Sequence, residues 1–152
     1  MHEQTPTETR TIRTRQALNE ALREEMQRDN RVFLMGEDIG AFNGAFKVTA
    51  GLMSEFGEHR VIDTPISEGS IMGVAVGAAM HGMIPVVEMM TVNFSFLALD
   101  QLINAASKLR FKFGGNVTVP LVLRMPGGGG HQLGPTHSHT MMRYWVRSLA
   151  AC

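Results

Sequence analysis

The apolar residues of this chain fall into short blocks that alternate between helical spacing and continuous runs. Residues 12–27 show the first helical block, which predicts an amphipathic helix, with Thr14 as its cap and an i,i+4 ion pair between Glu24 and Arg28. The run RVFLM at residues 31–35 follows, and it predicts a buried strand. The apolar positions of the helical block are Ala17, Leu18, Ala21, Leu22 and Met26.

The same alternation continues to about residue 125 and predicts an α/β fold. Because strands alternate with helices, we expect a parallel sheet with helices on both faces. The predicted elements are a short helix at 48–56 closed near Gly57, a strand at 61–66, a helix capped by Ser67 that runs to about Met80 and ends by Gly82, a strand at 84–90, a long helix at 94–113, and a strand at 117–125 that enters the glycine loop 127–130.

Composition limits the class of protein. The 152 residues, 44% of them hydrophobic and 18% charged, are enough for one compact folded domain. Fourteen basic residues balance fourteen acidic ones, which argues against a nucleic-acid partner because such partners usually meet a basic face. The longest apolar stretch, residues 71–80, has about half the length needed to span a bilayer. Residues 1–10 lack a secretory signal, and the single Cys152 suits a reducing compartment, so we expect a cytoplasmic protein without a membrane partner.

Glu68 is the first candidate for chemistry. It follows a predicted buried strand and lies in the first turn of an almost wholly apolar helix. An isolated acid at this place usually does no more than complement the helix dipole. Parallel sheets, however, bind ligands at the carboxyl ends of their strands, and a carboxyl group shielded from water can exchange a proton near neutral pH.

Glycine and histidine residues mark two further features. Gly69, Gly73 and Gly77 recur every four residues in the helix after Glu68, which indicates close contact with another helix, in this chain or a second subunit. The loop at 127–130 lacks the residues of a nucleotide phosphate loop and is more typical of an active-site rim. His131, His137 and His139 follow it. No further ligand stands at familiar spacing, so we predict no metal site, and the choice between a proton-handling histidine and a hydrogen-bonded loop histidine stays open.

Four longer segments carry a resemblance to a known family. They are RVFLMGEDIG, RVIDTPISEGSIMGVAVGAAMHGMIPVVEMMTVNFSF, DQLINAASKLRFKFGG and GGGGHQLGPTHSH, and the resemblance that they carry extends over about residues 11–139. In order and spacing they resemble the beta subunit of the thiamine-diphosphate-dependent decarboxylating component of pyruvate, branched-chain 2-oxo acid and acetoin dehydrogenase complexes. The elements DTPISE and THS are specific to that family. The resemblance implies a transketolase-like pyrimidine-binding domain at residues 11–139.

The resemblance also implies roles for individual residues. Glu68 matches the acid that hydrogen-bonds the cofactor's aminopyrimidine ring nitrogen and so activates the cofactor. Phe94 matches the aromatic residue that packs on the pyrimidine, and Met90 and Ile66 match further wall positions. His137 matches the active-site histidine that serves the substrate and the transfer of the acyl group to a lipoyl arm.

The cofactor and the partners are likewise implied by the family. Thiamine diphosphate is expected, with its Mg²⁺ held mainly by a separate alpha subunit in an α2β2 heterotetramer. A lipoyl-bearing acyltransferase core and a 2-oxo acid substrate complete the expected partners. The sequence favours a pyruvate or acetoin type without deciding between them.

The two ends of the chain differ from that pattern. Residues 1–10 are expected to form a loose arm. Residues 140–152 replace the continuation of the family, so we interpret them as an atypical tail of a shortened chain. Two alternatives to a catalytic beta subunit stay open at this point: a non-catalytic remnant, and the pyrimidine domain of another thiamine enzyme.

Overall fold

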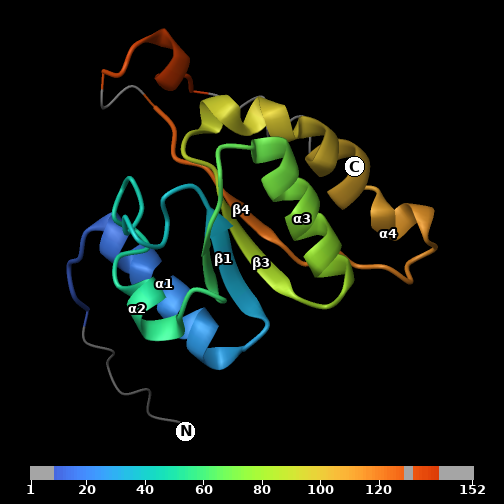
Figure 1. Cartoon of the computed structure of the whole chain (residues 1–152), viewed down its shortest axis with the longest axis horizontal. Coiled ribbons are helices and arrows are strands. Elements are labelled where there is room, and N and C mark those ends of the chain that lie inside the picture. The colour runs from blue at the N-terminus through green and yellow to red at the C-terminus, as the bar shows by residue number, and fades with distance from the viewer. Residues whose placement is uncertain (1–8, 129–131, 141–152) are drawn as a thin grey trace, which may run out of the picture.

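Four parallel strands form the sheet in the computed structural model, which describes residues 9–128 and 132–140 (Figure 1). Their order is β2 (Val61–Asp63), β1 (Val32–Gly36), β3 (Ile84–Glu88) and β4 (Val122–Arg124). The predicted parallel α/β sheet is therefore confirmed.

Three strands are shorter than predicted: β3 ends at Glu88 instead of residue 90, and prolines account for the differences in β2 and β4. The strand predicted at 61–66 ends at Asp63, although the Thr64 N–H still donates to the Gly36 carbonyl, because Pro65 has no N–H to continue the ladder. The strand predicted at 117–125 begins at Val122, after Pro120. Both strands lie at the edges of the sheet, where the described residues supply pairing on one side only.

Helices cover both faces of the sheet, as predicted (Figure 1). The helices α1 (Thr14–Arg28) and α2 (Leu52–Phe56) lie on one face, over a core that includes Met26, Leu34, Leu52, Val61 and Val86. On the other face, α3 (Glu68–Met80) and the helical segments that follow β3 enclose a larger core that includes Phe33, Met35, Met72, Val76, Val87 and Leu102. Each of these side chains is at most 8% exposed, and their burial drives folding.

The prediction of a single long helix at 94–113 is wrong. The chain forms a 3₁₀ segment, η1 (Val92–Ala98), then a π-helical segment, η2 (Gln101–Ala106), and one turn of α-helix, α4 (Leu109–Lys112). Side-chain bonds to the main chain favour these breaks: the buried Ser95 hydroxyl donates to the Val92 carbonyl at 2.5 Å, and the Ser107 hydroxyl to the Ile103 carbonyl at 2.7 Å.

The predicted helix starts and the predicted ion pair also need correction. Thr14 is the first residue of α1 rather than its cap. The helix predicted from residue 48 begins at Leu52, because Gly51 adopts a left-handed φ of 79°. Ser67 does precede α3, but its hydroxyl donates to the Ser70 hydroxyl instead of capping the main chain. Arg28 pairs with Glu25, one residue closer in the sequence than the predicted partner Glu24.

The glycine stripe of α3 contacts helical segments of the same chain. A Cβ at Gly69 would lie 3.1 Å from the Leu97 carbonyl oxygen in η1. At Gly73 the nearest atom belongs to Gln101 of η2, at 3.7 Å, whereas Gly77 faces open space. Close helix contact therefore explains the first two glycines, and it ties the start of α3 to η1.

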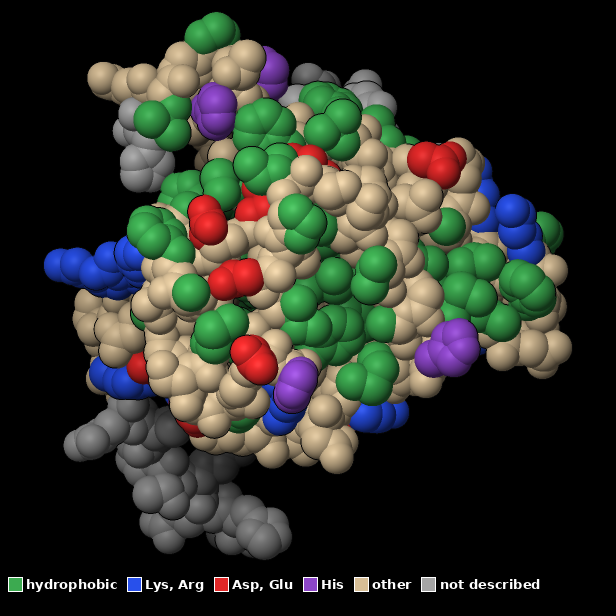
Figure 2. Space-filling model, viewed as in Figure 1, with side chains coloured by type: hydrophobic (Ala, Val, Ile, Leu, Met, Phe, Trp, Pro, Cys, Tyr) green, Lys and Arg blue, Asp and Glu red, His purple; other side chains and the backbone are tan. Residues whose placement is uncertain are grey.

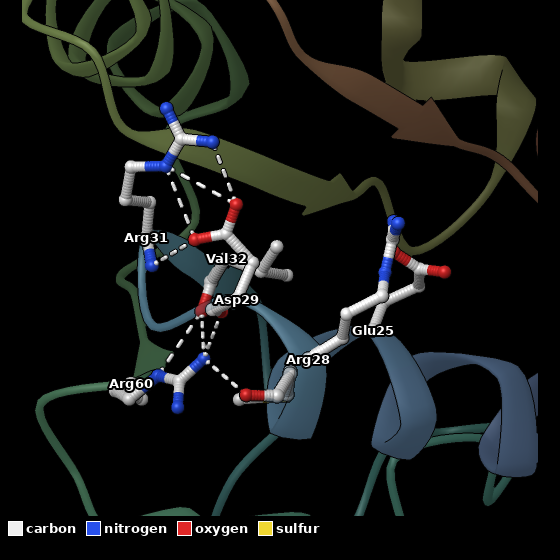
Figure 3. Close-up of polar contacts among 7 residues, drawn as sticks. Glu25, Arg28, Asp29, Arg31, Val32 and Arg60 are labelled. Carbon is white, nitrogen blue, oxygen red and sulfur yellow. Dashed lines mark hydrogen bonds and ion pairs between the residues drawn. The ribbon is translucent and has the colours of Figure 1, made fainter.

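Arg60 joins the end of α1 to the start of the sheet (Figure 3). Its guanidinium donates hydrogen bonds to the main-chain oxygens of Met26, Asp29 and Val32, at 2.6–3.1 Å. Nearby, the Arg31 guanidinium lowers the pKa of the Asp29 carboxyl to about 2. The bond to Met26 pairs a carbonyl group of the last turn of α1, and the other two bonds tie the guanidinium to the connection into β1.

Among the described residues, no helix combines the length and the apolar character that a membrane crossing requires.

The surface of the molecule exposes several large apolar side chains. Phe111 is 91% exposed beside Arg110 and Lys112, and Figure 2 shows apolar and basic side chains together at the α4 end of the molecule. Val74 on α3 and Leu97 on η1 are also exposed.

We predict that Arg60→Ala lowers the free energy of unfolding by about 3 kcal/mol, because three carbonyl acceptors lose a charged donor. Urea unfolding of the chain measures this loss. Arg60→Lys is the matched control, because it keeps the charge but cannot reach three acceptors. Its free energy of unfolding should lie between those of the parent and of Arg60→Ala. An Arg60→Ala chain as stable as the parent would contradict this role.

Candidate functional site

The register of the sheet aligns four residues in one row at the carboxyl ends of its strands, which we call the carboxyl edge of the sheet. Gly36 stands opposite both Asp63 and Glu88, and Glu88 stands opposite Arg124. A Cβ at Gly36 would lie 2.5 Å from the Glu88 carbonyl oxygen and 3.2 Å from the Glu88 Cβ. Glycine is therefore required at the end of β1, because any side chain would displace Glu88.

Each charged member of this row has its partner. The Asp63 carboxylate accepts hydrogen bonds from the main-chain N–H groups of Gly40 and Ala41, at 2.6 and 2.9 Å, and so holds the loop after β1. Glu88 forms a buried ion pair with Arg124. Burial lowers the pKa of the Arg124 guanidinium. The charged side chains of this row therefore serve the structure. The polar side chains without partners belong to the residues immediately beyond the row.

Glu68 and Glu37 are two buried carboxyl groups at this edge. Glu68 is the first residue of α3 and 3% exposed, and Glu37 follows β1 directly and is 6% exposed. Burial raises the pKa of Glu37, and the negative charges of Glu68 and then Asp38 raise it further. Both carboxyl groups are thus buried beyond the carboxyl ends of the strands.

Glu37 was not among the residues predicted from the sequence. Its only signal was an acid that follows a buried run, the same pattern that singled out Glu68. Only the tertiary packing reveals that its carboxyl group is buried like that of Glu68.

The structure brings Phe94 and His137 together. The two rings meet edge to face, with centroids 5.2 Å apart and planes at 84°. Phe94 lies in η1, whose later residue Leu97 packs against Gly69 at the start of α3, next to Glu68. His137 comes from η3 (Pro135–His137), and its Nδ1 is 3.0 Å from the Thr136 hydroxyl oxygen.

The two predicted wall residues differ in their surroundings. Met90 is partly buried just beyond β3, close in sequence to Phe94. Ile66 is 82% exposed, so this chain alone does not enclose it. Their assignment as cofactor contacts stays a prediction.

The predicted histidine cluster is only partly visible. His137 and His139 lie in the described segment 132–140, and His131 lies outside the described residues. Within the part of the chain that the structure describes, no three His, Cys, Asp or Glu side chains gather into a possible metal site.

Buried polar atoms without a hydrogen-bond partner concentrate at the same edge. In residues 9–128 and 132–140 each of them follows one of three strands, β1, β2 or β3. Such atoms cost free energy unless a ligand, water or partner group completes them. They are Glu37 Oε1, Thr64 Oγ1, Thr91 Oγ1 and both side-chain polar atoms of Asn93.

Together these features define an α/β protein whose candidate site lies at the carboxyl ends of the strands of a parallel sheet. Residues 10–152 match the family model described as transketolase, pyrimidine binding domain. The chain therefore belongs to this family, as the motifs in its sequence predicted.

Similar proteins carry a more specific name. The chain is 50% identical over 129 residues to the pyruvate dehydrogenase E1 component subunit beta of Gracilaria tenuistipitata var. liui, 52% over 130 residues to that of Chlorokybus atmophyticus, and 48% over 127 residues to that of Rickettsia bellii (strain RML369-C). These matches cover 84–86% of this chain and 39–40% of each relative. The chain thus spans about two fifths of the length of the curated relatives it matches.

We predict that Glu37→Gln stabilises the chain, and more so as the pH rises. The pKa of folded Glu37 lies above its ordinary value of 4.5, so the wild-type chain loses stability as the pH rises from 4.5 through the folded pKa. Glutamine carries no such penalty. Thermal unfolding from about pH 4 to about pH 8 measures the difference, with exposed Glu58→Gln as the control. A stability difference that stays constant with pH would contradict it.

Proposed function

We propose that this chain supplies the pyrimidine side of a thiamine diphosphate site in a 2-oxo acid dehydrogenase of the pyruvate dehydrogenase type. The observation that carries the proposal is the buried Glu68 at the start of α3, close to the Phe94–His137 pair through the contact of η1 with Gly69. The names of the relatives support the same function.

The residues at the edge fit the aminopyrimidine half of this cofactor. An aminopyrimidine offers ring-nitrogen acceptors, amino donors and a flat apolar face. A buried carboxyl group, unpaired polar side chains and an aromatic ring, as Glu68, Thr64 and Phe94 provide, complement those groups. When bound, thiamine diphosphate supplies the carbanion chemistry that cleaves a 2-oxo acid.

The protein side chains orient the pyrimidine ring of the cofactor and hold its proton. Glu68 holds a proton on the pyrimidine ring, and its burial keeps water from competing for that bond. Phe94 packs on the ring and fixes its plane. His137, held against Phe94, serves the substrate and the transfer of the acyl group to a lipoyl arm. Met90 and Ile66 form further wall positions, and the exposed side of Ile66 is completed by a partner.

A partner subunit is part of this proposal. An alpha subunit binds the diphosphate and its Mg²⁺, and two alpha and two beta subunits assemble into a heterotetramer that docks on a lipoyl-bearing acyltransferase core in the cytoplasm. The exposed apolar side chains of Ile66, Val74 and Leu97 support a covered surface beside the site. The expected substrate is pyruvate.

We predict that Glu68→Gln abolishes cofactor activation and leaves the fold intact. The amide keeps the shape of the side chain but cannot donate the carboxyl proton, so kcat should fall at least 100-fold. The measurement is thiamine-diphosphate-dependent decarboxylation of pyruvate by the chain co-expressed with an alpha subunit. The control is Glu58→Gln, on the exposed turn before β2, which should keep full turnover. Near-normal turnover of Glu68→Gln would sink the proposed role.

A further inference from the structure

Glu88 and Arg124 stand opposite each other at the ends of β3 and β4, and their ion pair is buried. Glu88 is 5% exposed, and the Arg124 side chain is 17% exposed. Every other ion pair in the part of the chain that the structure describes is more exposed. Taking two charges out of water costs free energy that their attraction often fails to recover. The pair therefore calls for a reason other than stability.

The chain segments that leave β3 and β4 stay together beyond the ion pair. The Met89 N–H donates to the Arg124 carbonyl at 3.1 Å, and the Val92 N–H donates to the Pro126 carbonyl at 2.8 Å. A Cβ at Gly127 would lie 2.9 Å from the Val92 Cγ1, so glycine is needed for this close approach. The segment after β4 therefore runs beside the segment after β3 from the ion pair to the start of η1.

These two segments determine where the rings of Phe94 and His137 lie. Phe94 belongs to η1, whereas the segment after β4 reaches the neighbourhood of His137 through the Gly128 N–H, which donates to the His139 carbonyl at 3.3 Å. Thr91, Gly128 and His137 line the same cavity of about 300 Å³. The edge-to-face contact of the two rings thus depends on the place of the segment after β4.

The strand β4 offers little hold on its own. It has three residues, and β3 is its one neighbour in the sheet formed by the described residues. In contrast, η1 packs on α3, where a Cβ at Gly69 would lie 3.1 Å from the Leu97 carbonyl oxygen. Phe94 therefore has a support that does not involve β4, and the segment after β4 is the one that needs a further contact.

We propose that Glu88 and Arg124 are positioning residues of the site, and that their ion pair holds the segment after β4 so that His137 stays against Phe94. A buried charged pair is satisfied in few arrangements, so it fixes the position of one strand end against the other. Apolar side chains of similar length would fill the same space without fixing that position. The expected effect on turnover rests on the proposed function, whereas the effect on the ring contact does not.

The first test observes the ring contact in the full chain by NMR. The Phe94 ring shifts the resonances of the His137 ring protons that lie close to it. His137→Gln identifies these resonances, and Phe94→Leu gives the direction and size of the shift. We expect the double substitution Glu88→Met with Arg124→Met to change the His137 resonances in the same direction as Phe94→Leu. Arg124→Lys keeps a charge opposite Glu88 and should leave the resonances close to those of the parent.

A matched control removes another ion pair, between Arg23 of α1 and Glu55 of α2, on the other face of the sheet. Arg23→Met with Glu55→Met should leave the His137 resonances unchanged. Thermal unfolding confirms that each variant is folded, and exchanging both charges of a buried pair for apolar groups often costs little stability. Glu88→Gln is a milder variant, for which we expect a smaller change in the same direction. Parental His137 resonances in the folded variants that lack the ion pair would overturn the inference.

The second test measures decarboxylation of pyruvate by the complex of the full chain with an alpha subunit. The double substitution at Glu88 and Arg124 should lower kcat about 100-fold, the order of effect of a displacement of about 1 Å at a reacting group. The Kd for thiamine diphosphate should not change, because α3 and η1 hold Glu68 and Phe94 without β4. A parental kcat would overturn the positioning role, and so would a loss of cofactor affinity that matches the loss of kcat. A parent complex without cofactor-dependent turnover contradicts the proposed function, and the NMR test then decides the positioning role alone.

Discussion

The parallel pairing of β1 with both of its neighbours is the constraint on which this site depends. Because Gly36 stands opposite Asp63 on one side and Glu88 on the other, the ends of three strands reach the edge of the sheet together. The missing side chain of Gly36 leaves the space that Glu88 occupies. With this register in place, Glu37 follows β1 directly and Glu68 begins the helix after β2, and η1, which contains Phe94, contacts the start of α3 through Leu97.

The site contains buried charged and polar groups that lower the stability of the fold. The carboxyl groups of Glu37 and Glu68 are both buried, and burial together with the charge of Glu68 raises the pKa of Glu37. Thr91 and Asn93 add buried polar atoms without partners. The apolar cores on the two faces of the sheet offset these costs. In contrast, the charged pair of Glu88 with Arg124 is satisfied within the chain, which fits a structural role.

Local patterns predicted the parts of the molecule that depend on local forces. The apolar runs at β1 and β3 and the helical period of α1 are properties of short segments, and each element formed close to where it was predicted. Glu68 could be singled out because a strand, an acid and an apolar helix follow one another directly. The match of residues 10–152 to the transketolase pyrimidine domain confirmed the family that the motifs indicated.

Features that depend on tertiary contacts could not be predicted in this way. The breaks between η1, η2 and α4 follow from serine hydroxyl groups that bond to the main chain and from the contact of Leu97 with Gly69. Glu37 is identified as a site residue only by the packing that places it near Glu68. Thr91 is identified only by the burial of its hydroxyl group in a residue that lines a cavity. The end of β2 and the start of β4, in contrast, follow from Pro65 and Pro120, which are local features of the sequence.

The most direct test of the central claim is a structure of this chain bound to an alpha subunit and thiamine diphosphate. The account predicts that the aminopyrimidine lies against Phe94 and that the Glu68 carboxyl is within about 3 Å of a pyrimidine ring nitrogen. A cofactor bound elsewhere, or a Glu68 carboxyl that remains out of hydrogen-bond reach of the pyrimidine, would contradict it.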